Sequence, residues 1–579
     1  MNTRLQTKIE ADRKLHDNQA AYRADYSTTD QIFILKSLLN KYINVKKGKL
    51  YGCFVDFRKA FDSVWHSGLL FKMLSQYNIG GKFYGIIKSM YCNAKSCVKL
   101  PCGVTKSFNL KKGIKQGDTL SPYLFNLYLN DVNEIFTRDE CCPPSLGVHE
   151  VKCLLYADDL LILSETAHGL QNSLNKLNIY CKTWKLHLNI KKTKVMIFSN
   201  KRKTENQDFT CGTETVAITD KYTYLGINFT KNGNFKEAVK SLCNKAMKGM
   251  FSLSSSLYTG ITISPTLPLK VFDSTIRPIL AYGSEVWSVE YFKLLLKPNL
   301  IDKAPFEMIN NKYCKYISGM PRRASNFAIK AELGRAPIFS FICTQALRYW
   351  HKLIKVNTNR ILRSAYESEL EIHNAGGTSW ATFVAKLLDL IGHDSSLQSP
   401  KSDHIKQHNY STSCKVKKEI PDLYFQFHVA SIGQHSKLRT YNKFKEGIGR
   451  EKYLDIEDLP QSNRKLFCAF RISCHDLEIE RGRYSTPPKP PEERICKICQ
   501  LQPETEEHFV IFCPHYKELR LELFKSVVRH DRDVCNIPNS EKCVYLMSHD
   551  NTEVIKAIMI FLSNAYKCRA LKLRGQQPV

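Results

Sequence analysis

Three aspartates have the residue type and the setting that phosphoryl-transfer chemistry requires. Asp56 ends a short apolar stretch, and Asp158 and Asp159 interrupt a second one. Nucleotide addition uses two metal ions, one to activate the attacking hydroxyl and one to neutralise the leaving pyrophosphate. Mg²⁺ prefers hard oxygen ligands such as carboxylates. We interpret the three acids together as metal ligands, although each taken alone is better explained as an ordinary turn aspartate.

A second group of potential ligands lies near the C-terminus. Cys496, Cys499, His508 and Cys513 have the spacing C-x2-C-x8-H-x4-C. Zinc binds four such ligands tetrahedrally, and a small loop with these spacings can supply them. Chance cysteines and a disulfide pair are the alternatives, but the chain opens without a secretory signal, which favours zinc. We expect His515 to be a spare histidine and not a ligand.

The hydrophobic pattern indicates the elements that must position the three acids. An apolar strand over residues 51–57 ends at the first acid, and a helix follows over 59–77. The run 151–164 predicts a hairpin with the two other acids at its turn. A helix is expected from Pro122, where proline is tolerated. Further elements are a helix with the stripe Leu170, Leu174, Leu177, Cys181 and Trp184, helix over 1–49, strands over 195–198 and 222–229, and mainly helices over 236–345.

The composition indicates a nucleic-acid partner. The 579 residues include 85 Lys and Arg against 55 Asp and Glu, a formal net charge of +30. Such an excess of cations suits a polymer of phosphates, although ribosomal, chromatin and membrane-surface proteins share it. Residues 1–14 are polar, and no apolar run reaches the length of a membrane span. We therefore expect an intracellular protein that does not enter a membrane.

Three longer motifs resemble a known family. Residues 55–64 (VDFRKAFDSV), 113–125 (GIKQGDTLSPYLF) and 156–159 (YADD) are similar to the three catalytic motifs of non-LTR (LINE-type) retrotransposon reverse transcriptases, in the family's order. The resemblance implies an RNA-directed DNA polymerase that transfers nucleotides from dNTPs to a primer 3′-hydroxyl with two Mg²⁺ or Mn²⁺ ions. It also implies an α+β right-hand fold: fingers and palm built from an antiparallel sheet with helices, then a mainly α-helical thumb and linker, and a small zinc knuckle.

The resemblance assigns roles to single residues of these motifs. It implies metal binding by Asp56, Asp158 and Asp159, completed by the backbone carbonyl of Phe57. Phe61 would lie under the incoming sugar and exclude a ribose 2′-hydroxyl, although a plain core phenylalanine is the alternative. The remaining residues implied to contact the substrate or the nascent base pair are Gln116, Gly117, Tyr156 and Ala157.

Weaker resemblances extend the predicted site. Residues 188–194 (LNIKKTK) resemble the family's fourth motif, which makes Lys192 a candidate to protonate the leaving pyrophosphate. A solvated basic loop explains this segment equally well. Tyr224, Leu225 and Gly226 resemble the primer-grip hairpin, which aligns the primer end. Arg23 is a candidate contact to the triphosphate.

The resemblance also predicts an N-terminally truncated protein. Residues 19–23 (QAAYR) and 27–31 (STTDQ) resemble a fingers segment, and family members carry more fingers sequence, and commonly an endonuclease, ahead of it. Because the missing fingers hold residues that grip the triphosphate, the activity of this chain is uncertain. The alternative is an inactive element remnant that only binds nucleic acid. Group II intron maturases share the Ala-Asp-Asp box, but the knuckle and residues 282–285 (YGSE) argue against that class.

The predicted organisation places five regions in order along the chain. The expected partners are an RNA template, a DNA primer or target and dNTPs, with no membrane. We expect a ribonucleoprotein of the nucleus and cytoplasm. The predicted boundaries are 1–235 for partial fingers and palm, 236–345 for a thumb-like helical region, 346–485 for a helical and linker region, 486–530 for the CCHC zinc knuckle and 531–579 for a basic helical tail.

Overall fold

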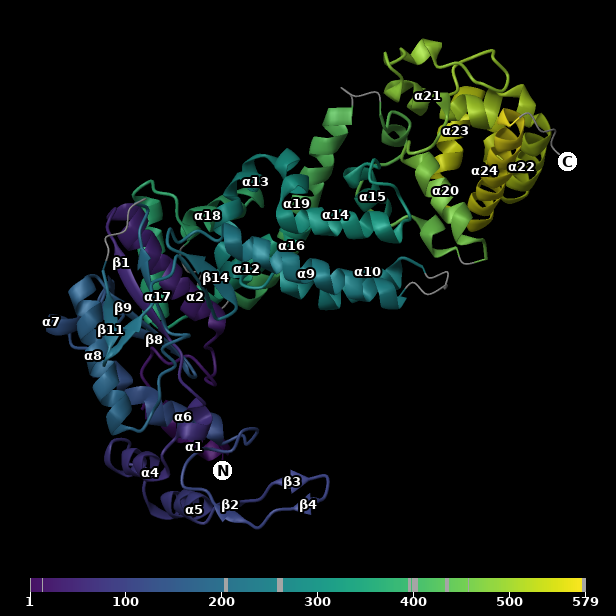
Figure 1. Ribbon diagram of the computed structural model, residues 1–579. Coiled ribbons are helices and arrows are strands. Elements are labelled where there is room, and N and C mark those ends of the chain that lie inside the picture. The colour runs from purple at the N-terminus through teal and green to yellow at the C-terminus, as the bar shows by residue number, and fades with distance from the viewer. Residues whose placement is uncertain are drawn as a thin grey trace. The chain divides into compact units, whose positions relative to one another are not determined.

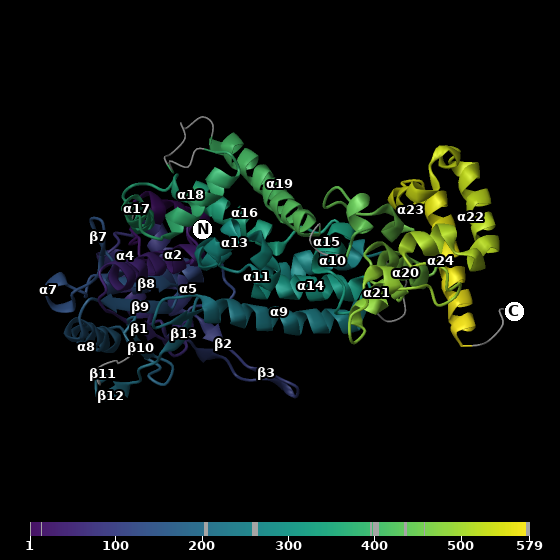
Figure 2. The same ribbon diagram turned by 90° about the horizontal axis from the view of Figure 1, so that it is seen from above.

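The computed structural model divides into two compact units (Figures 1 and 2). The first unit comprises Met1–Ala238, Gly283–Glu290 and Ala346–Asn409. The second comprises Val239–Tyr282, Tyr291–Gln345 and Tyr410–Val579. The structure describes residues 2–12, 14–201, 207–257, 264–393, 397, 405–432, 437–456 and 458–574.

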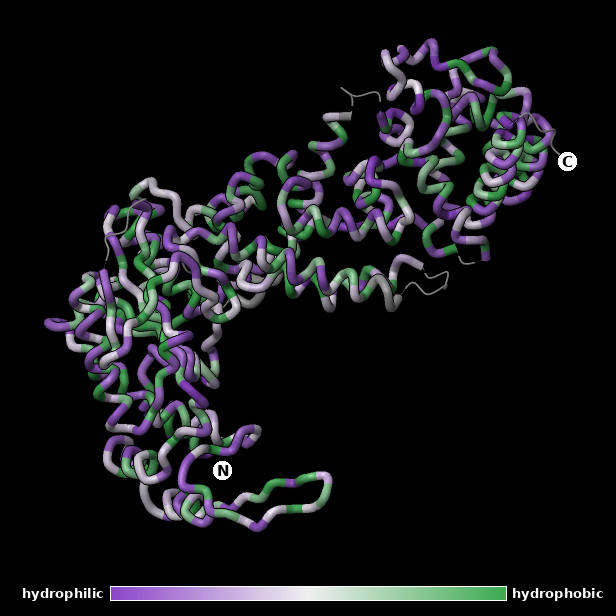
Figure 3. Tube along the Cα trace, in the orientation of Figure 1, coloured by the Kyte–Doolittle hydropathy of each residue, from purple (hydrophilic) through white to green (hydrophobic). Residues whose placement is uncertain are grey.

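A four-stranded antiparallel sheet forms the centre of the first unit. Its order is β10 (Lys194–Phe198), β1 (Leu50–Val55), β9 (Asp159–Ser164) and β8 (Cys153–Tyr156). Every residue of β1 is buried, because the strand is central and both of its faces are covered. Figure 3 shows hydrophobic residues gathered in this sheet. The predicted strand and hairpin around the three acids are therefore confirmed.

Helices cover one face of the sheet. Helix α8 (Ala167–Thr183) packs on β1 and β9, and α6 (Ser121–Leu129) packs against α4 (His66–Ser75). The predicted stripe on α8 is confirmed, because Leu170, Leu174, Leu177 and Cys181 are all buried in one core. Proline 122 lies in the first turn of α6, as expected.

Segments distant in sequence complete the first unit. Helix α2 (Thr28–Leu39) packs against α12 (Ser284–Trp287) and α17 (Ile361–Asn374), and α17 packs against α18 (Trp380–Leu390). The buried Asp30 on α2 accepts a hydrogen bond from Tyr349 and forms an ion pair of 2.6 Å with Lys352. Residues more than a hundred positions after the sheet therefore pack against α2, which precedes the sheet in the chain.

Three predicted elements differ from the structure. Residues 1–49 contain α1 (Asn2–Ala11) and α2, but 16–27 are not helical because Gln19 pairs alongside β8. The predicted helix over 59–77 is broken at Val64 into α3 (Ala60–Ser63) and α4. The predicted strand over 222–229 is a hairpin of two short strands, because residues 225 and 226 adopt a left-handed turn.

In its described residues the second unit is helical and has no strand. Buried ion pairs connect its helices: Arg471 of α20 (Gln461–Arg471) binds Glu332 of α15 (Asn326–Glu332) at 2.9 Å. The sheet of the first unit and the helices of the second confirm the predicted α+β class and the mainly helical later half. No described helix is both long enough and apolar enough to cross a bilayer.

One buried cation ties α4 to the helices around it. The Lys72 ammonium is fully buried and donates 2.6 Å hydrogen bonds to Asp131 and to the Tyr128 carbonyl. It also lies 3.8 Å from the centre of the Trp184 ring. Burial lowers the pKa of Lys72 to about 8, and Asp131 opposes this shift. Its partners therefore offset part of the solvation that burial removes.

Replacing Lys72 with methionine is expected to lower the free energy of unfolding by about 3–5 kcal/mol, because Asp131 loses its partner. Urea denaturation followed by tryptophan fluorescence measures this change. The exposed Lys88→Met is the matched control, with an effect within about 0.5 kcal/mol. Between pH 8 and the pKa of ~10.4 of an unfolded lysine, the unfolded parent binds more protons than the folded parent, so the free energy of unfolding of the parent rises with pH. The variant lacks this group, so the difference in unfolding free energy between parent and variant should widen as pH rises. A difference that narrows over this range would contradict the assignment.

Candidate active site

The turn between β8 and β9 carries two of the three acids. Tyr156 pairs with Asp159, which leaves Ala157 and Asp158 as a two-residue hairpin loop. Ala157 has a φ of 57°, a left-handed conformation that is unfavourable for a residue with a Cβ. Strain of this kind persists only where surrounding contacts impose it, and it is concentrated at functional sites.

The side chain of Gln19 imposes this turn. It is fully buried, its Oε1 accepts a 3.2 Å hydrogen bond from the Ala157 N–H, and its Nε2 donates to the Ala157 carbonyl at 3.4 Å. The same Oε1 accepts from the Ala21 N–H at 3.1 Å. Sequence reasoning placed Gln19 in a fingers segment and missed this role, because no local pattern connects residues 138 positions apart.

Asp56 is brought to the same end of the sheet by strand register. Val55 pairs with Leu160, so the next residue of β1 lies beside Asp159. Asn189 donates a 2.9 Å hydrogen bond to Asp56 Oδ2, and the Asp56 N–H donates to Thr193 Oγ1 at 3.2 Å. The loop of the predicted fourth motif therefore orients the first acid, through two residues that sequence reasoning did not single out.

Two other predicted residues lie beside Asp56. Lys192 Nζ is 4.0 Å from Asp56 Oδ2, and its side chain is 70% exposed, so it is free to move toward a substrate. Phe57 is buried and pairs by its backbone with Leu188. The structure thus gathers Asp56, Phe57, Lys192 and the two acids of the turn at one edge of the sheet.

The three carboxylates repel one another. Burial, followed by the charges of Asp158 and Asp56, raises the pKa of Asp159 to about 6. Burial also raises the pKa of Asp158, with Asp56 as a second cause. Within the described residues, the Lys192 contact is the only ion pair that any of the three makes. A group of acids held together without matching cations is suited to bind a divalent metal ion.

The residues predicted to meet the nucleotide come from two segments, one just after β1 and one just before α6. Phe61 on α3 is half-buried and stacks on Phe125 of α6, with ring centres 4.5 Å apart. Gln116 is exposed and donates a 3.3 Å hydrogen bond to Asp62. Gly117 has a φ of 88° and open space where a Cβ would lie, so its backbone conformation is what requires glycine here.

The predicted primer-grip residues form a tight hairpin. Strands β13 (Lys221–Tyr224) and β14 (Ile227–Thr230) are joined by Leu225 and Gly226, with φ values of 45° and 81°. Two successive left-handed residues are typical of a type I′ hairpin turn. Tyr222 stacks on Phe54 of β1, with ring centres 4.3 Å apart, and burial together with Asp159 and Asp56 raises the pKa of Tyr222 to about 12. The hairpin therefore packs on the sheet close to the acids.

Arg23 does not reach out from the protein. Its guanidinium binds both carboxylate oxygens of Glu10 at 2.9 Å and donates to the carbonyls of His16 and Gln19. Its side chain is 6% exposed. In this conformation Arg23 fixes the N-terminal segment, and its guanidinium is not available to a triphosphate.

The predicted zinc ligands also come together, in the second unit. One ligand atom from each of Cys496, Cys499, His508 and Cys513 lies within 4.8 Å of the others. Cys499 Sγ is 3.3 Å from His508 Nε2. The Gln500 N–H donates to the Cys496 carbonyl and the Cys513 N–H to the His508 carbonyl, so two tight turns present the ligands in pairs. This geometry fits a tetrahedral metal ion, and His515 is outside the group.

Part of the chain is similar to known proteins. Residues 1–229 match the family model described as reverse transcriptase (RNA-dependent DNA polymerase), a range that contains all three acids and the β13–β14 hairpin. A solved structure of telomerase from Candida tropicalis with a fragment of telomeric RNA aligns with a TM-score of 0.32 and 16% identity, over 63% of this chain and 56% of that one.

Curated relatives include polymerases of mobile elements. The probable RNA-directed DNA polymerase from transposon BS of Drosophila melanogaster is 28% identical over 48% of this chain and 30% of the relative. The RNA-directed DNA polymerase from mobile element jockey of Drosophila funebris is 23% identical over 62% and 38%. The chain thus spans about a third of the length of these relatives. The resemblance predicted from the motifs is confirmed: the segment that carries the acid group is similar to the reverse transcriptases of non-LTR retrotransposons.

Proposed function

We propose that the first unit catalyses RNA-directed DNA synthesis, adding dNTPs to a primer 3′-hydroxyl. The observation that carries this proposal is the group of Asp56, Asp158 and Asp159 at one end of a buried sheet. The buried Gln19 side chain, which holds the β8–β9 turn, and the Asn189 hydrogen bond keep these acids together despite their repulsion. Keeping like charges together costs stability, so a fold that does so is built for a cationic ligand.

The proposed ligand is a pair of Mg²⁺ ions, with Mn²⁺ as a substitute. The three carboxylates and the backbone carbonyl of Phe57 would hold them, and the oxygen-only donor set fits this choice. When bound, these ions supply activation of the primer hydroxyl and neutralisation of the leaving pyrophosphate. Their charge would also counter the repulsion among the carboxylates, which adds to burial in raising the pKa values of Asp158 and Asp159.

The remaining residues would position the substrates. Phe61, held flat against Phe125, would exclude a ribose 2′-hydroxyl. Gln116 would contact the templating base pair, and the β13–β14 turn would align the primer end. Lys192, mobile and close to Asp56, would deliver a proton to the pyrophosphate.

Replacing Asp158 with asparagine is expected to reduce primer extension at least 10²–10³-fold, because one carboxylate of the metal site is lost. Extension of oligo(dT) on poly(rA) with Mg²⁺ measures this loss. The matched control is Asp139→Asn, an exposed aspartate of α7 (Arg138–Cys141). If the folded parent binds RNA but makes no product, the proposal is refuted and a protein that only binds nucleic acid is favoured instead.

The proposed metal site can be tested by thermal melting, without measuring enzymatic activity. Without metal, Asp159→Asn should melt at a higher temperature than the parent, because the variant removes one of three repelling charges. Saturating Mg²⁺ should raise the Tm of the parent by selective binding to the folded state and should leave the variant nearly unchanged. Equal shifts in both proteins would rule out a metal site at these acids. Calorimetry measures both values.

We also propose that Cys496, Cys499, His508 and Cys513 bind one Zn²⁺ ion. Two further contacts support a built site around them. Arg520 donates to the carbonyls of Val510 and Cys513, and Arg569 forms a buried 2.8 Å ion pair with Glu504, beside the first ligand. These arginines fix the two turns that present the ligands, and the ion would close the loop as a structural element.

Replacing Cys499 with serine is expected to abolish stoichiometric zinc, since sulfur ligands dominate the site. Elemental analysis of the purified protein gives the zinc content. Cys535→Ser, which changes an exposed cysteine outside the group, is the control and should retain one ion per chain. Full zinc content in Cys499→Ser would show that the ion lies elsewhere.

A further inference from the structure

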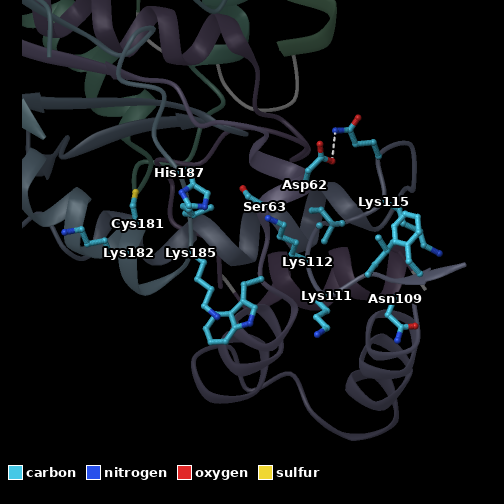
Figure 4. Close-up of a pocket in the computed structure, with 17 residues that line it drawn as sticks. Asp62, Ser63, Asn109, Lys111, Lys112, Lys115, Cys181, Lys182, Lys185 and His187 are labelled. Atoms are coloured by element: carbon cyan, nitrogen blue, oxygen red, sulfur yellow. Dashed lines mark hydrogen bonds between the residues drawn. The ribbon is translucent and has the colours of Figure 1, made fainter. Parts of the chain in front are cut away.

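A large cavity opens beside the proposed polymerase site (Figure 4). Its volume is about 1200 Å³, larger than the 300–1,000 Å³ of ordinary small-molecule sites. One wall is formed by residues 108–116, which lead into and begin the second motif, and the opposite wall by residues of 181–187 at and after the end of α8. Asp62, Ser63 and Trp65 form the base. We call this cavity the lysine groove.

The lysine groove is strongly cationic. Its only acid is Asp62, which accepts the Gln116 hydrogen bond drawn in Figure 4. In the described part of the chain, none of its lysines forms an ion pair, and all are exposed. Unpaired cations on facing walls repel one another, which favours a polyanion between them. The five lysines are Lys111, Lys112, Lys115, Lys182 and Lys185.

Aromatic side chains stand among these lysines. Phe108 is 48% exposed on the short strand β5 (Phe108–Asn109). The ammonium of Lys185 lies 3.9 Å from the centre of the Trp65 ring, which it covers. An exposed aromatic ring beside cations, as Phe108 is here, is a combination that binds single-stranded nucleic acid, with phosphates on the lysines and a base on the ring. In a duplex the base faces are already stacked and cannot use such rings.

We propose that the lysine groove binds a single-stranded segment of RNA, namely the template strand ahead of the point of synthesis. The proposal rests on the proposed polymerase function for the identity of this strand. Gln116, which would contact the templating base pair, belongs to the wall of the groove, so the groove adjoins the position proposed for that base pair. The size of the cavity accommodates more than one nucleotide.

The charge of the groove is tested by the salt dependence of RNA binding. The probe is a labelled oligo(rU) of about twelve nucleotides, within the range of single-strand site sizes. Because each phosphate contact contributes about −0.7 to the slope of log K against log salt, a variant with Lys111, Lys115 and Lys185 changed to Gln should have a slope less negative by about 2. Fluorescence anisotropy at increasing KCl measures it.

A matched control separates the groove from general charge. Lys8, Lys47 and Lys201 are exposed lysines of the first unit outside the groove. Their triple change to Gln removes the same charge and should leave the slope near the parental value. If the control variant shows the same change in salt slope as the groove variant, or if the slope of the groove variant is unchanged, the proposal is overturned. Thermal melting confirms that both variants are folded.

The aromatic wall gives a second measurement. Phe108→Ala retains every charge, so it should weaken oligo(rU) binding about tenfold without changing the salt slope. Binding of an RNA duplex of the same length should not change. An equal effect on duplex and single strand would overturn the single-strand assignment.

All binding is repeated in the Asp158→Asn background, which removes synthesis. If the groove substitutions still weaken oligo(rU) binding in this background, but the parent extends no primer, the polymerase proposal is refuted and the RNA-binding groove is retained.

Discussion

Mutual repulsion of three carboxylates is the constraint around which the first unit is organised. The acids are brought together by β1 and the β8–β9 hairpin, whose register fixes Asp56 beside Asp159. Hydrogen bonds then hold each side: a buried one from Gln19 at the turn, and partly buried ones with Asn189 and Thr193 at the strand end. Burial and this repulsion together raise the pKa of Asp159 to about 6, so the core beneath the acids must hold them in place.

That rigidity comes from burial on both faces of β1. Helix α8 covers one face with an apolar stripe, and the aromatic contact between Phe54 and Tyr222 places the β13–β14 hairpin on the other. The same contact brings the predicted primer-grip turn toward the acids. Packing of apolar residues and placement of reactive ones are therefore achieved by the same strands.

Much of the local structure could be predicted from the sequence because it depends on local patterns. The apolar run interrupted by Asp158 and Asp159 and the stripe on α8 correctly indicated a hairpin and a helix. Local patterns failed where distant segments compete: residues 16–27 pair beside β8 and do not continue a helix, and two left-handed residues divide the expected strand at 222–229. The isolated pairing of Gln19 with Leu155 leaves no periodic signature in either segment.

The sequence by itself determined which chemical groups this protein has: three acids in apolar surroundings, a Cys and His set at metal-ligand spacing, and an excess of cations. Only the tertiary structure decided which of these groups act together. It committed Arg23 to Glu10, assigned Gln19 and Asn189 to hold the acids, and gathered five lysines around one groove. The reason is physical: spacing along a chain fixes neighbours within one element, whereas contacts between elements depend on register, packing and burial, which distant residues set jointly.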